Sequence, residues 1–162
     1  MLIEIENFIE DHLCDYFVEH HKKNSKNINK DSHHRDTKII SCEAQAYQAG
    51  DLHFKILLAK LNYLIKNHSK NSLIKYPEIV EWPEKSSQDE HIDFDYHPYT
   101  SILYLNDNYK GGETMVGDKK IHPKKGKIVL FEGNKIKHRV LEISAGIRYT
   151  NATWYITPKR ER

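Results

Sequence analysis

The chain has 162 residues, of which 30% are charged and 38% hydrophobic, and its formal net charge is +2 with the histidines neutral. No apolar run approaches the roughly 20 residues that cross a membrane, and the N-terminal MLIEIENFIEDH lacks the basic start and cleavage site of a secretory signal. These features exclude a membrane-spanning helix and do not indicate nucleic acid as a partner. They predict a cytoplasmic protein that folds as one domain over residues 1–162, with Cys14 and Cys42 as reduced thiols.

The first half of the chain is predicted to be helical, because Gly50 is the only Gly or Pro before Pro77. Apolar side chains recur there at helical spacing and predict a first helix over about residues 7–22. Asn7 and Glu10 are placed as a capping pair at the start of this helix.

A polar segment and a second helix follow. The segment Lys22–Asp36 has no periodicity, so we expect an exposed and mobile loop in which His33 and His34 are solvated rather than metal ligands. A second apolar stripe begins after Asp51, whose carboxylate can cap a helix that starts at the next residue. The helical part, about residues 1–70, would then support the rest of the chain.

The second half, about residues 77–157, contains short strand-like runs separated by turn signals such as NDNYKGG and EGN. Regular short strands with turns are typical of a sandwich or barrel. The predicted fold class is therefore α+β with a mainly β core. The strands are predicted at Glu78–Trp82, Thr100–Asn106, Glu113–Val116, Lys127–Phe131 and Arg148–Ile156.

A metal site is suggested by the motif HID, which places His91 and Asp93 two residues apart and, in an extended strand, on one face. Such a pair alone is weak, because a chain with 11 His and 23 Asp plus Glu produces it by chance. His138, next to predicted strands, completes a set of two His and one carboxylate. This set suits Fe(II) with open positions better than a closed zinc site. His97 and His122, both before proline, are expected to be structural or solvated.

Arg148 lies ten residues after His138 in AGIRYTNATWYI. Alternation along a strand sends four side chains of this segment to one face, those of Arg148, Thr150, Ala152 and Trp154. A guanidinium that faces the interior requires an anionic partner. A dicarboxylate that chelates the metal at one end would supply this anion at the other. A surface ion pair for Arg148 and a surface position for His138 are the alternatives.

From about Pro77 to Ile156, the chain resembles the prolyl 4-hydroxylase-like branch of the 2-oxoglutarate- and Fe(II)-dependent oxygenases. The similarity rests on the order and spacing of IVEWP, HID, TSILYLND, GGET, IHPKKGKIVLF, KHRV and GIRYTNATWY. It implies a double-stranded β-helix, or jelly roll, supported by N-terminal helices. It also implies hydroxylation of a substrate carbon, with peptidyl proline as the first candidate and with release of succinate and CO2.

The resemblance assigns roles residue by residue. It implies that His91, Asp93 and His138 bind Fe(II), and that Arg148 and Tyr104 hold the distal carboxylate of 2-oxoglutarate. The implied cofactors are Fe(II), 2-oxoglutarate as cosubstrate and O2, with ascorbate as a further candidate. The implied partner is a peptide or small-molecule substrate.

Three alternatives remain open at the level of the sequence. The substrate can be a free amino acid or another small molecule. A nucleic-acid demethylase of the same superfamily would carry a second Arg six residues after the first, where this chain has Trp154. A non-catalytic jelly-roll protein would usually lack one of the ligands. Trp82 also departs from the family, because many relatives carry a tyrosine there, near the metal-side end of the cosubstrate.

Overall fold

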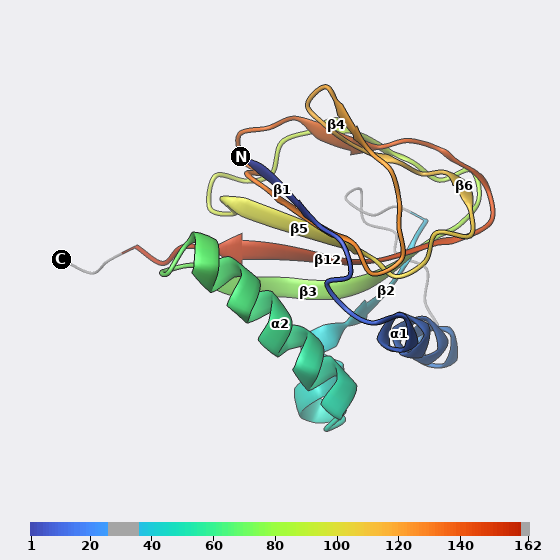
Figure 1. Ribbon diagram of the computed structural model, residues 1–162, viewed down its shortest axis with the longest axis horizontal. Helices are drawn as coiled ribbons and strands as arrows, with labels where there is room; N and C mark the ends of the chain where they lie inside the picture. The colour runs from blue at the N-terminus through green and yellow to red at the C-terminus, as the bar shows by residue number, and fades with distance from the viewer. Residues whose placement is uncertain (26–35, 160–162) are drawn as a thin grey trace.

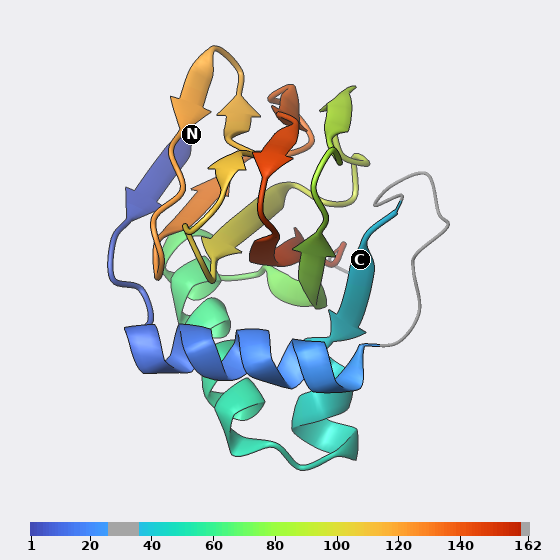
Figure 2. The ribbon, with the colours of Figure 1, turned by 90° about the vertical axis from the view of Figure 1, so that its right-hand side faces the viewer.

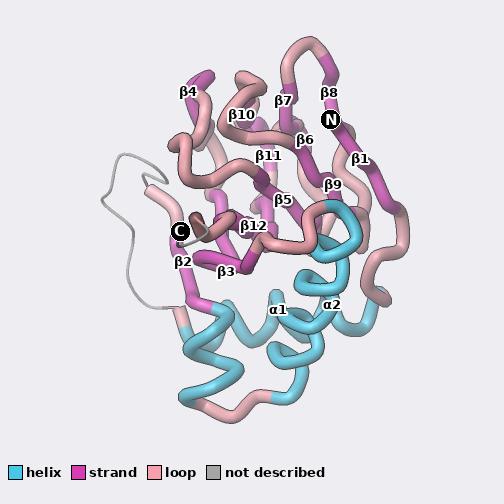
Figure 3. The backbone as a smooth tube through the Cα atoms, turned by 90° about the vertical axis from the view of Figure 1, so that its left-hand side faces the viewer, coloured by secondary structure: helices cyan, strands magenta, loops and turns pink. Residues whose placement is uncertain are grey.

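The computed structural model describes residues 1–25 and 36–159. Figure 1 shows two α-helices, α1 (Asp11–Asn24) and α2 (Leu52–His68), on the same side of a layered β structure. The view in Figure 2 shows α1 running across one end of the molecule, below the strands. Figure 3 shows the separation most clearly, with the helices gathered beneath the strands. The predicted helical support and mainly β core are confirmed.

The strands form two larger antiparallel sheets and a short strand pair. The six-stranded sheet has the order β1-β9-β5-β12-β3-β2, the four-stranded sheet has the order β4-β10-β7-β8, and β11 pairs with β6. Every pairing is antiparallel, and neighbours in a sheet are seldom neighbours in sequence. The strands are β1 (Leu2–Ile5), β2 (Lys38–Ser41), β3 (Leu73–Trp82), β4 (Gln88–His91), β5 (Tyr99–Tyr104), β6 (Lys110–Gly111), β7 (Thr114–Val116), β8 (Lys119–Ile121), β9 (Ile128–Phe131), β10 (His138–Val140), β11 (Ile143–Ala145) and β12 (Arg148–Ile156).

The second helix begins as predicted. The Asp51 carboxylate accepts hydrogen bonds from the backbone N–H groups of His53, at 2.8 Å, and Phe54, at 3.2 Å. These are two of the N–H groups that have no partner inside a helix, so the cap stabilises the first turn of α2. The apolar stripe of α2 is buried against the six-stranded sheet in the largest apolar core of the molecule.

The predicted first helix was wrong at its start. The helix begins at Asp11 rather than near residue 7, because Leu2–Ile5 forms β1 and pairs with β9 at the edge of the sheet. Asn7 has a positive φ of 54°, and Glu10 makes no side-chain capping hydrogen bond. The apolar residues that completed the helical pattern here belong to a strand and a turn.

The predicted loop at Lys22–Asp36 was partly wrong, because Lys22–Asn24 continue α1. His33 and His34 lie outside the described residues. Strand β2 and a π-helix at Ala44–Gln48 follow, and neither was predicted.

The five predicted strands correspond to β3, β5, β7, β9 and β12. Strand β3 is longer than expected, since it starts at Leu73 and continues through Pro77. Strands β4, β6, β8, β10 and β11 were missed, because each has only two to four residues and little apolar alternation. Both cysteines are free thiols, as predicted, and both are buried. Among the described residues, no helix is both long and apolar enough to span a membrane.

Candidate active site

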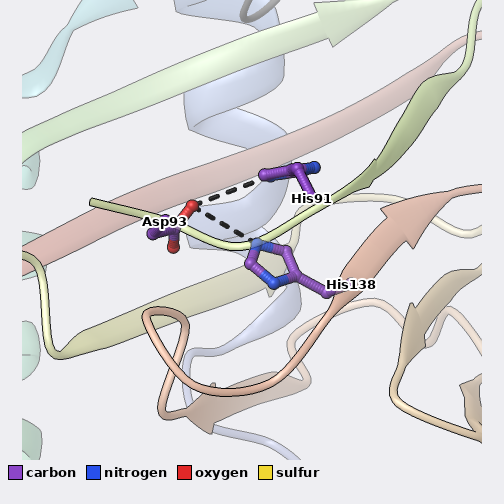
Figure 4. Close-up of side chains that lie close together, drawn as sticks. All are labelled: His91, Asp93 and His138. Atoms are coloured by element: carbon purple, nitrogen blue, oxygen red, sulfur yellow. Dashed lines mark ion pairs between the residues drawn. The ribbon is translucent and has the colours of Figure 1, made fainter. Parts of the chain in front are cut away.

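Three potential metal ligands meet where β4 and β10 pair. His91 ends β4, His138 begins β10, and the two residues are partners in the strand register. The Asp93 Oδ1 atom lies 3.4 Å from His138 Nε2 and 3.7 Å from His91 Nε2 (Figure 4). One ligand atom from each of the three side chains lies within 4.8 Å of the others. In the described parts of the chain, no other group of three His, Cys, Asp or Glu side chains meets in this way.

The expectation that HID lies wholly in one strand was wrong, because Asp93 lies beyond the end of β4. A backbone hydrogen bond places it instead: Asp93 N–H donates to the Gly133 carbonyl at 2.9 Å. Its Oδ2 atom accepts a hydrogen bond from the Thr100 hydroxyl, which leaves Oδ1 facing the two imidazoles. The turn that contains Gly133 and the strand that contains Thr100 therefore orient this carboxylate.

Backbone carbonyls fix both imidazole rings. His91 Nδ1 lies 2.8 Å from the Asp89 carbonyl oxygen, and His138 Nδ1 lies 2.8 Å from that of Ile136. A carbonyl only accepts, so each Nδ1 carries the hydrogen and each Nε2 lone pair faces the shared centre. Such outer contacts are the usual means by which proteins orient metal-binding histidines.

The charge states also suit a metal ion. Burial by itself raises the pKa of Asp93, but the adjacent His138 imidazole and the hydrogen bond from Thr100 outweigh it and lower this pKa to about 2. Burial lowers the pKa of His91, which favours its neutral form. A metal then competes with few protons for either residue at neutral pH. Two imidazoles and one carboxylate with adjacent free space fit Fe(II) in a site with open positions.

The pocket next to this triad is lined by one face of β12. Arg148, Thr150, Ala152 and Trp154 all contribute to its wall, as the alternation predicted. In the register, Trp154 lies opposite Thr100, the residue that binds Asp93. The triad is therefore near the Trp154 end of β12, and Arg148 lies at the other end.

At that other end, Arg148 is buried, with only 1% of its surface exposed. Its Nη2 donates to Thr114 Oγ1 at 3.1 Å, and the Tyr104 hydroxyl lies 2.7 Å from the same Thr114 atom. Within residues 1–25 and 36–159, no carboxylate pairs with the guanidinium, and its Nε has no hydrogen-bond partner. A buried cation without an anion is costly, so this end of the pocket fits a carboxylate.

Several residues at the site escaped the sequence analysis. Thr114 and Thr100 contact Arg148 and Asp93 as described above. The Tyr109 hydroxyl is buried without a hydrogen-bond partner in the described chain. Burial raises the pKa of Tyr109, and the nearby Arg148 acts against this rise. Gly112, which the sequence marked as a turn, has a φ of +67°, and a Cβ there would meet the side chains of both Tyr109 and Arg148.

The remaining candidates take other positions. Trp82, whose role the sequence left open, is the cross-strand partner of Arg148, and its ring centroid lies 5.2 Å from the guanidinium carbon. His97 is buried outside the ligand group, and its ring centroid lies 6.4 Å from that of Trp154. His122 is exposed.

Comparison with known proteins agrees with this geometry. A family model described as the 2OG-Fe(II) oxygenase superfamily matches residues 77–156. No curated protein matches the chain significantly. Among solved structures, the viral collagen prolyl hydroxylase from Paramecium bursaria Chlorella virus-1, in its 2-oxoglutarate complex, has 18% identity and a TM-score of 0.75. That match covers 98% of this chain and 96% of the viral chain.

Two further prolyl hydroxylases are similar in structure. The prolyl 4-hydroxylase from Pseudomonas putida has 17% identity and a TM-score of 0.74, and the match covers 98% of this chain and 93% of the bacterial one. The enzyme from Trichoplax adhaerens, solved with a hypoxia-inducible-factor peptide, has 19% identity and a TM-score of 0.77, over 96% and 83% of the two chains. These likenesses confirm the predicted jelly roll. The chain belongs to the 2OG-Fe(II) oxygenase superfamily and resembles its prolyl hydroxylase-like branch.

Proposed function

We propose that this dioxygenase binds Fe(II) through His91, Asp93 and His138, holds the distal carboxylate of 2-oxoglutarate with Arg148 and Tyr104, and hydroxylates peptidyl proline. One observation carries the assignment of these residues. The triad and the buried guanidinium line the same pocket, an arrangement that suits a dicarboxylate held at both of its ends.

The residues of the chain have separate tasks in this proposal. His91, Asp93 and His138 would hold the iron and would leave coordination positions open for other ligands. Arg148 and the Tyr104–Thr114 pair would fix the length and direction of the cosubstrate. When bound, iron supplies the O2 activation that is coupled to decarboxylation of 2-oxoglutarate to succinate and CO2. Apolar walls such as Phe131 and Val140 would exclude water from the pocket.

The choice of proline as substrate rests on similarity. The three similar structures described above are prolyl hydroxylases, and one of them was solved with a peptide. Free amino acids and other small molecules are the second substrate class, and nucleic acid is disfavoured because Trp154 replaces the second Arg. Ascorbate as a reductant belongs to the same proposal.

Anaerobic titration tests the metal and cosubstrate assignments. Adding Fe(II) and then 2-oxoglutarate to metal-free protein should give the weak visible charge-transfer band of an iron–keto acid chelate. His138→Ala should abolish this band, whereas His97→Ala should keep it. Equal loss in the two variants would overturn the choice of ligands, and a folded, iron-loaded protein without a band would indicate a non-catalytic jelly roll.

The substrate is tested separately by mass spectrometry after aerobic turnover. Proline-containing peptides, free proline and other free amino acids are offered in parallel, with and without ascorbate. A peptide that gains the mass of one oxygen atom, in step with succinate release, supports the proposal. Oxidation of free amino acids alone would replace peptidyl proline with the small-molecule class.

A further inference from the structure

Large apolar side chains are exposed immediately beyond the metal ligands. Ile92, between His91 and Asp93, is 52% exposed, and Phe94 and Tyr96 are 65% and 62% exposed. Tyr76 of β3, 53% exposed, lies close by, because its ring and that of Tyr96 both contact His97. We call Phe94, Tyr96 and Tyr76 the aromatic strip. Contiguous exposed apolar groups of this kind commonly mark a binding surface.

The strip is held in a defined shape. The rings of Phe94 and Tyr96 are stacked, with centroids 5.2 Å apart and planes 10° apart. The segment that carries them closes on itself through a hydrogen bond from His97 N–H to the Phe94 carbonyl at 2.8 Å. The Asn134 side chain also donates to the Asp95 carbonyl at 3.3 Å. A surface that is already ordered loses little entropy when it binds a partner.

The strip is continuous with the pocket wall. The Tyr96 ring lies 4.6 Å from the His97 ring, and the His97 ring lies 6.4 Å from that of Trp154, which lines the pocket. Arg148 binds the cosubstrate at the far end in the proposed function, so the substrate carbon has to approach the triad near Trp154. A substrate that extends outside the pocket on this side would therefore run toward the strip.

We propose that the aromatic strip docks the residues flanking the target proline in an extended, proline-rich peptide, an inference that rests on the proposed function. None of the three side chains is charged, and the stacked pair offers flat apolar faces. Proline rings pack on aromatic faces, and the polyproline II helix is ordered before binding, so aromatic surfaces recognise it readily. A free amino acid would end inside the pocket and would not reach the strip.

Direct binding tests the inference without turnover. The protein, loaded with Fe(II) and 2-oxoglutarate under anaerobic conditions, is titrated into a labelled oligoproline peptide, and fluorescence anisotropy is recorded. Phe94→Ala and Tyr96→Ala should each weaken binding by about tenfold, as for a buried aromatic anchor. Tyr63→Ala, which removes an aromatic of similar exposure from α2, is the matched control and should bind like the wild type. Retention of the iron–keto acid band in all three variants shows that the site is still assembled.

The outcomes separate the inference from the function it rests on. If wild-type protein oxidises proline peptides but the Phe94 and Tyr96 variants bind them as well as Tyr63→Ala does, the strip is not the docking surface. If wild-type protein shows neither binding nor oxidation of any proline peptide, both the inference and the peptidyl-proline proposal are wrong. If sedimentation shows a peptide-independent dimer that Phe94→Ala dissociates, the strip binds a second copy of the chain instead.

Discussion

Replacing Gly133 with alanine tests how the structure positions the Asp93 carboxylate, the proposed metal ligand. Gly133 has no positive φ, so alanine is compatible with its backbone. A Cβ at this position would, however, lie less than 3.0 Å from both Asp93 Oδ2 and Thr100 Oγ1. Real Cβ atoms essentially never come so close to other heavy atoms. The Asp93 side chain or the turn must therefore move in Gly133→Ala.

The expected magnitude follows from what has to move. Inserting a methyl group into a packed site costs about 1–3 kcal/mol of stability. The larger effect falls on the metal, because the carboxylate loses the support that aims it at His91 and His138. Losing the support of a ligand typically lowers metal affinity by about 10- to 100-fold. We expect a loss of Fe(II) affinity in this range.

Anaerobic Fe(II) titration in the presence of 2-oxoglutarate measures the affinity, and urea unfolding of the metal-free protein measures the stability. Gly50→Ala is the matched control, because Gly50 has a φ of +68° but no heavy atom within 4 Å of its virtual Cβ. The control should lose about 1 kcal/mol from backbone strain and keep its iron affinity. If Gly133→Ala binds Fe(II) as tightly as Gly50→Ala, the argued placement of Asp93 is wrong.

Three further changes probe other parts of the molecule. Arg148→Lys should raise the 2-oxoglutarate concentration needed for turnover about tenfold, because lysine lacks the forked donors of arginine. Turnover with 2-oxobutyrate, which lacks the distal carboxylate, should hardly change in this variant. Tyr109→Phe should weaken 2-oxoglutarate binding about fivefold in the same titration, roughly one hydrogen bond, and spare Fe(II) affinity. Burial raises the pKa of Glu78 from 4.5 to about 7. At a pH between these two values, Glu78 keeps its proton in the folded protein but has lost it in the unfolded chain. Stability should fall by at most about 3 kcal/mol as the pH rises through this window, and Glu78→Gln should flatten the profile in urea unfolding.

Much of the site could be predicted because chemistry restricts which residues can form it. Two His, one Asp and one Arg at the family's spacing have few other uses in a jelly roll, and alternation along β12 correctly sent Arg148 to the interior. The face of a strand to which a side chain points depends only on its place in the local sequence, so period-two alternation predicts it. The start of α2 could also be predicted from neighbouring residues, because Asp51 caps the helix that begins at the next residue.

The contacts that complete the site depend on pairings between distant segments. Thr114 reaches Arg148 from β7, 34 positions away, and Gly133 supports Asp93 from a turn 40 positions away. Threonine and glycine are common in strands and turns, so neither residue type by itself indicates a role at the site. The same reasoning explains the error at α1: only pairing with β9, far along the chain, makes Leu2–Ile5 a strand.

An irregularity in β3 links the catalytic pocket with the aromatic strip. Between Ala152 and Trp154 on β12, the register on β3 moves from Glu78 to Lys75, so β3 contains one extra residue. Tyr76 lies in this bulge with a φ of +49°, a conformation that costs a tyrosine free energy and that bulges accommodate. The bulge leaves Tyr76 exposed beside His97, while Trp154 on the paired strand still lines the pocket. Strain of this kind persists where the surrounding structure enforces it, and here β3 is paired with β12 on both sides of the bulge, which holds Tyr76 in this conformation.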